Sequence, residues 1–294
     1  MEKIIRLKNV HHDLIWGCED WIISAHKNGE SIIDGGEFDG QSLSSLFNTN
    51  REVFGNIEGS EFPLLVKIID AKTALSIQVH PGDEYAQKNE SSLGKTECWY
   101  ILDCADDSDI IVGQKANNRE EFQKAIDDGT VMDIMQVMPA NVGDFFHIPA
   151  GTVHAIRDNT KILEIQQSSD VTYRLYDYDR KDKDGNLREL HVDKSLDVIN
   201  YDYKHGANNF ITTKYDGYVV EKLVASRYFD VEKVTINNDC IIKNNESFIL
   251  GVALGGAINV NGTLIENESS FIIPNGVDLN VVGSGQLMLS YVAR

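Results

Sequence analysis

Short hydrophobic segments alternate with turn residues along most of the chain. The segments are rich in β-branched and aromatic residues, and Pro, Gly, Asn and Asp gather between them. Many short strands separated by regular turns are typical of a β-sandwich or barrel. The pattern therefore predicts a mainly β protein. Five of the clearest predicted strands lie at 64–70, 75–79, 98–102, 109–113 and 145–149.

Helical patterns are confined to a few stretches. The clearest covers 118–129, where Asn118 is placed to cap the first turn. A second short helix is expected at 130–137, so that the two form a small helical insertion near 118–137. Two further helical candidates are 42–48 and 194–200.

A weak internal repeat relates the middle of the chain to its C-terminal part. Residues 145–156 and 270–281 both have the pattern of an apolar strand, a Pro-x-Gly turn and a second strand. His154 of the first copy corresponds to Leu279 of the second, and no histidine follows His205. If both copies belong to the same small barrel, only the first keeps metal-binding chemistry; the alternative is two unrelated strand–turn–strand units. The predicted domains are 1–205, which contains the helical insertion, and 206–294, a β domain without metal ligands.

Charge and composition exclude several classes of partner. The 294 residues carry a formal net charge of −19, which repels nucleic acid and anionic membranes. There is no signal-peptide pattern and no apolar run of about 18 residues, so we expect a cytoplasmic protein that does not span a membrane. The four cysteines show no CxxC spacing, which is typical of incidental thiols in a reducing compartment. The sequence leaves the oligomeric state open.

Polar side chains occur at inward-facing positions of two predicted strands. Gln78 and His80 are two residues apart and therefore project from the same face of their strand, and Ser76 has the same parity. On the next strand, Glu97 shares an inward face with Trp99, and Lys95 has the same parity again. A buried carboxylate without a partner is costly, and a bound metal ion would remove that cost. A plain β-sandwich core would carry aliphatic residues there.

A second histidine completes a candidate metal site. His154 follows a strand and a tight turn, so we expect it on a rigid hairpin. Two histidines, one carboxylate and the amide oxygen of Gln78 make a mixed nitrogen and oxygen site that suits a catalytic metal. Zinc fits this ligand set best, and iron(II), manganese or cobalt are alternatives. His147 is a rival ligand that we assign to packing or to the pocket.

These residues resemble the two sequence motifs of the cupin superfamily. Residues 143–154, with their Pro-x-Gly turn and final histidine, fit the second motif, although Asp158 stands where that motif usually has Asn. In the first motif, Gln78-x-His80 replaces the usual His-x-His, and an insertion displaces the acidic residue to Glu97.

Longer segments resemble one cupin family, the type I mannose-6-phosphate isomerases (phosphomannose isomerases), and most closely its short bacterial form. The resemblance is strong over roughly 60–200 and holds only in general character over 210–294. It implies two cupin-like β-barrels (jelly-roll sandwiches), of which 206–294 is the metal-free one. The segments that carry it are 63–71, 75–86, 94–102 and 162–180.

The resemblance also implies an activity and roles for particular residues. The family's enzymes are metal-dependent aldose–ketose isomerases that interconvert mannose 6-phosphate and fructose 6-phosphate by proton transfer between C1 and C2 through a cis-enediol. The implied partner is thus a small sugar phosphate. Glu164 is implied as the proton carrier, with a carboxylate that orients a ligand histidine as the alternative. The implied zinc ligands are His80, Glu97, His154 and Gln78, the catalytic residues are Arg174 and Glu164, and the substrate-binding residues are Ser76, Lys95 and Arg180.

Two other functions compete with the isomerase. A cupin of another chemistry, such as an iron(II) oxygenase, would use the same ligands, but it would need no cations to hold a phosphate. A non-catalytic sugar-binding module would leave the pairing of Glu164 with Arg174 beside the metal unexplained. We therefore expect the isomerase.

Overall fold

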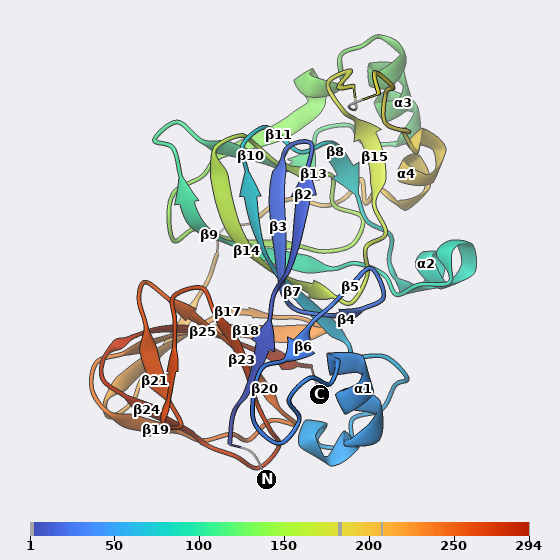
Figure 1. Ribbon diagram of the computed structural model, residues 1–294. Helices are drawn as coiled ribbons and strands as arrows, with labels where there is room; N and C mark the ends of the chain where they lie inside the picture. Colours follow the sequence, from blue (N-terminus) through green and yellow to red (C-terminus); the bar gives the residue numbers. More distant parts are fainter. Residues whose placement is uncertain (1–2, 182–183, 207, 294) are drawn as a thin grey trace. The chain divides into compact units, whose positions relative to one another are not determined.

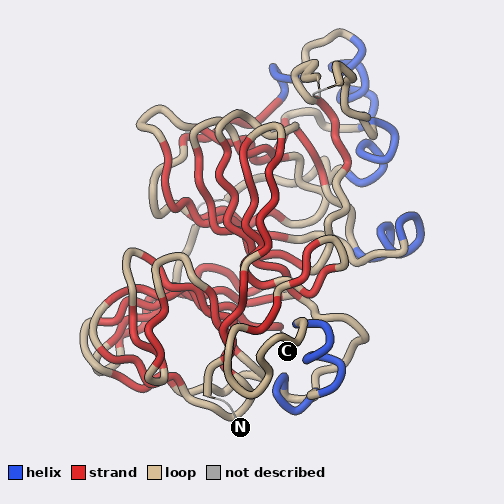
Figure 2. The backbone as a smooth tube through the Cα atoms, viewed as in Figure 1, coloured by secondary structure: helices blue, strands red, loops and turns tan. Residues whose placement is uncertain are grey.

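The protein consists mainly of antiparallel strands, as the sequence predicts (Figures 1 and 2). The computed structural model describes residues 3–181, 184–206 and 208–293. None of the described helices is long and apolar enough to cross a membrane. All four cysteines are free.

The chain folds into two compact units, each built from separated segments. Unit 1 contains Met1–His11, Asp20–Lys67 and Asn208–Arg294, and unit 2 contains His12–Glu19 and Ile68–Ala207. Much of the N-terminal region joins unit 1, because strand β1 (Ile5–Lys8) pairs with β23 (Ser270–Ile273). The residues of the predicted domain 1–205 are therefore distributed over both units. The predicted boundary between 205 and 206 stays a prediction.

Unit 1 is built from an eight-stranded sheet and a four-stranded sheet with a hydrophobic core between them. The sheet orders are β16-β17-β18-β25-β20-β23-β1-β6 and β19-β24-β21-β22. Phe271 and Leu289 of the larger sheet and Val281 of the smaller belong to one buried cluster. The other strands are β4 (Ala25–His26), β5 (Gly29–Glu30), β6 (Ile32–Ile33), β16 (Ile211–Lys214), β17 (Tyr218–Ala225), β18 (Phe229–Ile236), β19 (Cys240–Ile242), β20 (Ile249–Leu254), β21 (Ile258–Val260), β22 (Thr263–Ile265), β24 (Leu279–Val282) and β25 (Gly285–Val292), and the helices are α1 (Leu43–Thr49) and the 3₁₀ helix η1 (Arg51–Phe54).

Unit 2 contains a five-stranded sheet, β11-β10-β13-β8-β15, and most of a six-stranded sheet, β12-β9-β14-β7-β3-β2. Trp99 and Phe146 of the larger sheet share a buried cluster with Ile110 and Ile156 of the smaller. The strands are β2 (Val10–Leu14), β3 (Gly17–Ile23), β7 (Leu64–Ala71), β8 (Ile77–Val79), β9 (Glu97–Cys104), β10 (Asp109–Gln114), β11 (Met135–Pro139), β12 (Phe145–Ile148), β13 (His154–Ile156), β14 (Thr160–Gln167) and β15 (Tyr173–Tyr176), of which β2, β3 and β7 continue into unit 1.

Helices cover the outer face of the five-stranded sheet. Phe122 of α3 (Arg119–Asp127) and Leu196 of α4 (Val192–Val198) belong to the same buried cluster as Ile77 and Val79 of β8. Because neighbouring residues of a strand point to opposite faces, the outward Ile77 and Val79 leave Gln78 on the inner face. The helices thereby fix which residues of β8 face the interior of the unit.

The predicted helices are mostly present, with two differences. Asn118 caps α3 by accepting a hydrogen bond from Glu121 N at 2.9 Å, as expected, and α1 and α4 overlap the other two candidates. The prediction of a helix over 130–137 is wrong beyond a single 3₁₀ turn, η2 (Val131–Ile134), because β11 then pairs with β10. A further helix, α2 (Asp83–Glu90), was not predicted.

The turn before His154 joins two sheets rather than two strands of a hairpin. β12 pairs with β9, whereas β13 pairs with β10 and β8. The expectation that His154 lies on a hairpin is therefore wrong. The turn instead carries the chain from one sheet to the other, and it places His154 opposite Gln78 of β8.

We expect Gly251→Ala to destabilise unit 1 by about 1–3 kcal/mol through overpacking. Gly251 lies opposite Phe271 across β20 and β23, and a Cβ at Gly251 would lie 2.1 Å from Phe271 Cζ. Denaturant unfolding measures the change in the free energy of unfolding. Gly206→Ala is the matched control, since no described atom lies within 4 Å of a Cβ there apart from its chain neighbours. Equal stability of the two variants would contradict the prediction.

Candidate functional site

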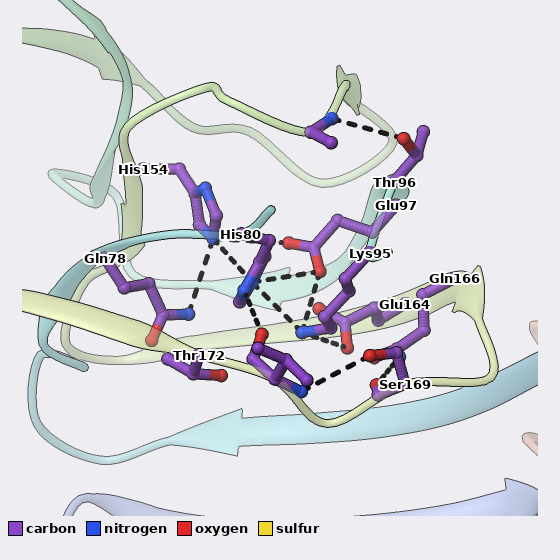
Figure 3. A network of polar contacts seen from close by, with 12 residues as sticks. Gln78, His80, Lys95, Thr96, Glu97, His154, Glu164, Gln166, Ser169 and Thr172 are labelled. Carbon is purple, nitrogen blue, oxygen red and sulfur yellow. Dashed lines mark hydrogen bonds and ion pairs between the residues drawn. The ribbon is translucent and has the colours of Figure 1, made fainter. Parts of the chain in front are cut away.

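Three buried side chains converge at one end of the unit 2 sandwich. His80 Nε2 and His154 Nε2 lie 3.1 Å apart, and the Glu97 carboxylate lies 3.5 Å from the first and 3.4 Å from the second (Figure 3). All of the ligand atoms lie within 4.8 Å of one another. These side chains converge, as expected from the sequence. The set of His80, Glu97 and His154 could hold a metal ion.

Both sheets contribute to this cluster. His80 directly follows β8 and His154 begins β13, so both belong to the side of the five-stranded sheet. Glu97 begins β9 in the six-stranded sheet, on the same face as Trp99 and Ile101 of the buried core. The alternation of strand residues therefore puts the two imidazoles and the carboxylate into the same interior.

Each imidazole is oriented by its other ring nitrogen. His80 Nδ1 lies 2.8 Å from the carbonyl oxygen of Val171, and His154 Nδ1 lies 2.8 Å from that of Thr152. A carbonyl oxygen only accepts hydrogen bonds, so Nδ1 carries the proton in both rings and the Nε2 lone pairs face the common point. Burial lowers the pKa of His154 to about 4, so the ring is neutral near pH 7, as a metal ligand must be.

The Glu97 carboxylate is fully buried. Apart from its ion pair with Lys95, it has no hydrogen-bond partner among the described residues. The lone pairs of two imidazoles point toward each other beside this carboxylate. A divalent cation bound between them would accept both lone pairs and neutralise the buried charge. The residues present therefore fit a metal ion.

Gln78 lies beside the cluster. Its Nε2 is 3.4 Å from His154 Nε2, and its Oε1 accepts a hydrogen bond of 3.4 Å from Ser76 Oγ. A half-turn of the amide would direct the oxygen to the common point, and the hydroxyl of Ser76 could then accept from the amide nitrogen. Gln78 is thus close enough to act as a further ligand.

Lys95 lies inside the cluster rather than at its rim. The side chain is buried, and Nζ is 2.9 Å from Glu97 Oε2, 3.1 Å from His80 Nε2 and 4.0 Å from Glu164 Oε1. Burial alone would lower the pKa of Lys95, but the negative charges of Glu97 and Glu164 outweigh it and raise the pKa. The ammonium group therefore stays charged and neutralises carboxylates within the site.

Glu164 makes a hydrogen bond and a longer ion-pair contact within the site. Its Oε2 accepts a hydrogen bond of 2.9 Å from Trp99 Nε1, and its Oε1 faces Lys95. Trp99 was expected on the inner face, but its hydrogen bond to Glu164 was not predicted from the sequence. The signal was available, because a buried indole N–H usually requires an acceptor and the inward carboxylate of Glu164 is a nearby candidate.

The two arginines are Arg174 on β15 and Arg180 in the loop that follows β15. Arg174 of β15 is directly opposite Gln78, and its Nη1 donates to the carbonyl oxygen of Glu189 at 3.4 Å. Arg180 donates to the carbonyl oxygen of Ala74 and lies 3.6 Å from Asp177. The contacts described for the two arginines are thus with residues other than the three clustered ligands.

Comparisons with known proteins point to one family. Residues 4–125 match a family model for the catalytic domain of type I phosphomannose isomerases. The mannose-6-phosphate isomerase ManA of Bacillus subtilis is 41% identical over 259 residues, which cover 88% of this chain and 81% of that protein. The mannose-6-phosphate isomerase of Streptococcus mutans is 38% identical over 277 residues, covering 90% and 87%.

Solved structures show the same fold. The crystal structure of the mannose 6-phosphate isomerase from Bacillus subtilis superposes with a TM-score of 0.93 at 35% identity, covering 99% of this chain and 100% of that one. A putative mannosephosphate isomerase from Archaeoglobus fulgidus, at 19% identity, superposes with a TM-score of 0.79 over 100% of this chain and 99% of its own. The second likeness extends to the fold alone.

We expect Lys95→Met to destabilise the metal-free protein by about 3–5 kcal/mol, because Glu97 and Glu164 would lose their buried cation. Added zinc should restore part of the loss by supplying another positive charge. Denaturant titrations with chelator and with zinc measure both effects. The control is Lys243→Met, since the Lys243 side chain is 71% exposed and pairs with Asp278 at the surface. That change should cost less than about 1 kcal/mol, and equal losses in the two variants would contradict the prediction.

Proposed function

The chain belongs to the type I phosphomannose isomerase family, and we propose that it interconverts mannose 6-phosphate and fructose 6-phosphate. The observation that carries the proposal is the buried His80–Glu97–His154 set with one ammonium and a second carboxylate beside it. An aldose–ketose isomerisation needs a group that polarises the sugar oxygens and a group that moves a proton between C1 and C2. The site offers candidates for both within a few ångströms.

We propose that His80, Glu97 and His154 hold one zinc ion per chain, with Gln78 as a fourth ligand after its amide turns. Nitrogen ligands and one carboxylate oxygen are typical of zinc, and another divalent metal could occupy the same set. When bound, the ion would act as a Lewis acid toward the sugar oxygens. The two carbonyl contacts of the imidazoles would keep the ligand nitrogens aligned in its presence and its absence.

We propose Glu164 as the group that carries the proton between C1 and C2. The hydrogen bond from Trp99 fixes one carboxylate oxygen and leaves the other on the side of Lys95 and the cluster. A positioned carboxylate of this kind typically contributes about 10²–10⁴-fold to the rate. Arg174, opposite Gln78 on the neighbouring strand, would stabilise charge that develops on the sugar oxygens.

The phosphate would be held at the arginine side of the site. Ser76 and Arg180 are the proposed contacts, because Arg180 already reaches the carbonyl oxygen of Ala74, two residues before Ser76. The contact of Lys95 with the phosphate stays a prediction. In the structure, the ammonium group of Lys95 pairs with Glu97 instead. The proposed partner is thus a small sugar phosphate, and a cytoplasmic location remains the expectation from the sequence.

Removing the metal should abolish turnover, and returning zinc should restore it. The measurement is a coupled assay of fructose 6-phosphate formed from mannose 6-phosphate, before and after exhaustive chelation, with the metal content determined in parallel. His154→Ala should have the same effect as the chelator while the fold is kept. Full activity of the metal-free protein would reject the proposal, and oxygen consumption by the metal-loaded protein would favour the oxygenase alternative.

Replacing Glu164 with Gln should lower kcat by about 10²–10⁴-fold with little change in KM or metal content, because the amide keeps the size and the acceptor for Trp99 but is not a base. Steady-state kinetics and metal analysis of the same preparation measure both quantities. If the carboxylate only orients the ligands, the metal affinity will fall instead and kcat at saturating metal will recover. That result would contradict the role as proton carrier.

A further inference from the structure

The side chain of Gln167, the last residue of β14, bridges two segments that carry proposed metal ligands. Its Oε1 accepts a hydrogen bond of 2.9 Å from Thr96 N, between Lys95 and Glu97. Its Nε2 donates a hydrogen bond of 2.9 Å to Asp83 Oδ1, three residues after His80. Both ends of a single amide are therefore used. The Gln167 side chain is buried, so neither contact is easily replaced by bulk water.

Asp83 also connects these two segments, because it belongs to the one after His80 and hydrogen-bonds to the one that leads to Glu97. The oxygen that accepts from Gln167 also accepts a hydrogen bond of 2.9 Å from Gly94 N, in the loop that leads to Glu97. The approach is close, since a Cβ at Gly94 would lie 2.5 Å from Asp83 N. Asp83 begins α2, the helix that directly follows His80-Pro81-Gly82. The carboxylate therefore connects the start of this helix with the start of β9.

The backbone around these contacts is joined as well. Gln167 N donates to Thr96 O at 3.1 Å, and Lys95 N donates to Pro81 O at 3.0 Å. Figure 3 shows Thr96 and Ser169 at the edge of the polar network that includes the clustered ligands. The segment after Gln167 then supplies Val171 O, which orients His80. Gln167 is thus bonded to the segment that carries Glu97 and is followed by the segment whose carbonyl group orients His80.

We propose that Asp83 and Gln167 are positioning residues that fix His80 relative to Glu97 and so set the affinity of the site for its metal. Neither side chain contacts the ligand atoms; both act on the backbone that carries them. Groups that orient metal ligands typically contribute about 10–100-fold to metal affinity or activity. The inference rests on the proposed metal-dependent isomerase, but its main readout is metal affinity rather than turnover.

The test compares Gln167→Leu with wild type by competition for Co²⁺ or Zn²⁺ against a chromophoric chelator. We expect a 10–100-fold weaker metal affinity and a changed visible spectrum of the Co²⁺ form, which reports the ligand geometry. With saturating metal, kcat should fall while KM changes little. Wild-type metal affinity and an unchanged Co²⁺ spectrum in Gln167→Leu would overturn the proposal.

Variants of Asp83 separate positioning from general stability. Asp83→Asn keeps an oxygen that can accept from both Gly94 N and Gln167, so it should retain most of the metal affinity, whereas Asp83→Ala should lose as much as Gln167→Leu. Equal behaviour of Asp83→Asn and Asp83→Ala would overturn the proposal. Should Gln167→Leu fail to fold, this Asp83 pair carries the test with Gln167 intact.

A matched control comes from another glutamine–aspartate pair. Gln123 Nε2 donates to Asp127 at 2.8 Å on the exposed face of α3, so Gln123→Leu removes a similar bond far from the ligands in the sequence. Its metal affinity should equal that of wild type, and an equal loss in Gln123→Leu would overturn the proposal. If wild type binds metal but does not isomerise mannose 6-phosphate, the proposed function fails while the positioning role is still decided by metal affinity.

Discussion

A carboxylate enclosed in a β-sandwich is the constraint on which the site depends. Glu97 is fully buried on the same strand face as Trp99, where an isolated negative charge would be strongly unfavourable. Lys95 pairs with it, and the neutral imidazoles of His80 and His154 direct their lone pairs to the same point. The buried carboxylate is therefore compensated by its neighbours, and the three side chains together could hold a metal ion.

The sandwich determines how such a group can form. The outer face of β8 is covered by α3 and α4, so its aliphatic residues turn outward and its polar residues turn inward. On the inner face of β9, Glu97 is followed by Trp99 and Ile101 of the buried core, and the other charged residue of the strand, Asp103, is exposed. The three candidate ligands thus lie at one end of the unit, where β8 ends and where β9 and β13 begin.

Strand alternation was enough to predict the fold class and the inward positions of His80 and Glu97, because period-two patterns decide which residues share a face. The place of His154 beside them was implied by the family resemblance, since the hairpin expected to carry it is absent. The sequence did not predict α2, the sheet-to-sheet turn before His154, or the contact of Trp99 with Glu164. The helix and the contact had signals that were not used, the acidic first turn of α2 and the need of a buried indole N–H for an acceptor. The turn depends on which strands pair, and strand pairing leaves no local pattern. The roles proposed for Arg174 and Arg180 rest on resemblance for the same reason.

The turn before His154 has one more consequence. Because it carries the chain across the sandwich, the two imidazoles approach the common point from the five-stranded sheet and the carboxylate approaches it from the six-stranded sheet. An ion bound by all three would cross-link the layers much as a disulfide does, with a bond that can open and re-form. Separation of the layers at this end and release of the ion would then be a single motion.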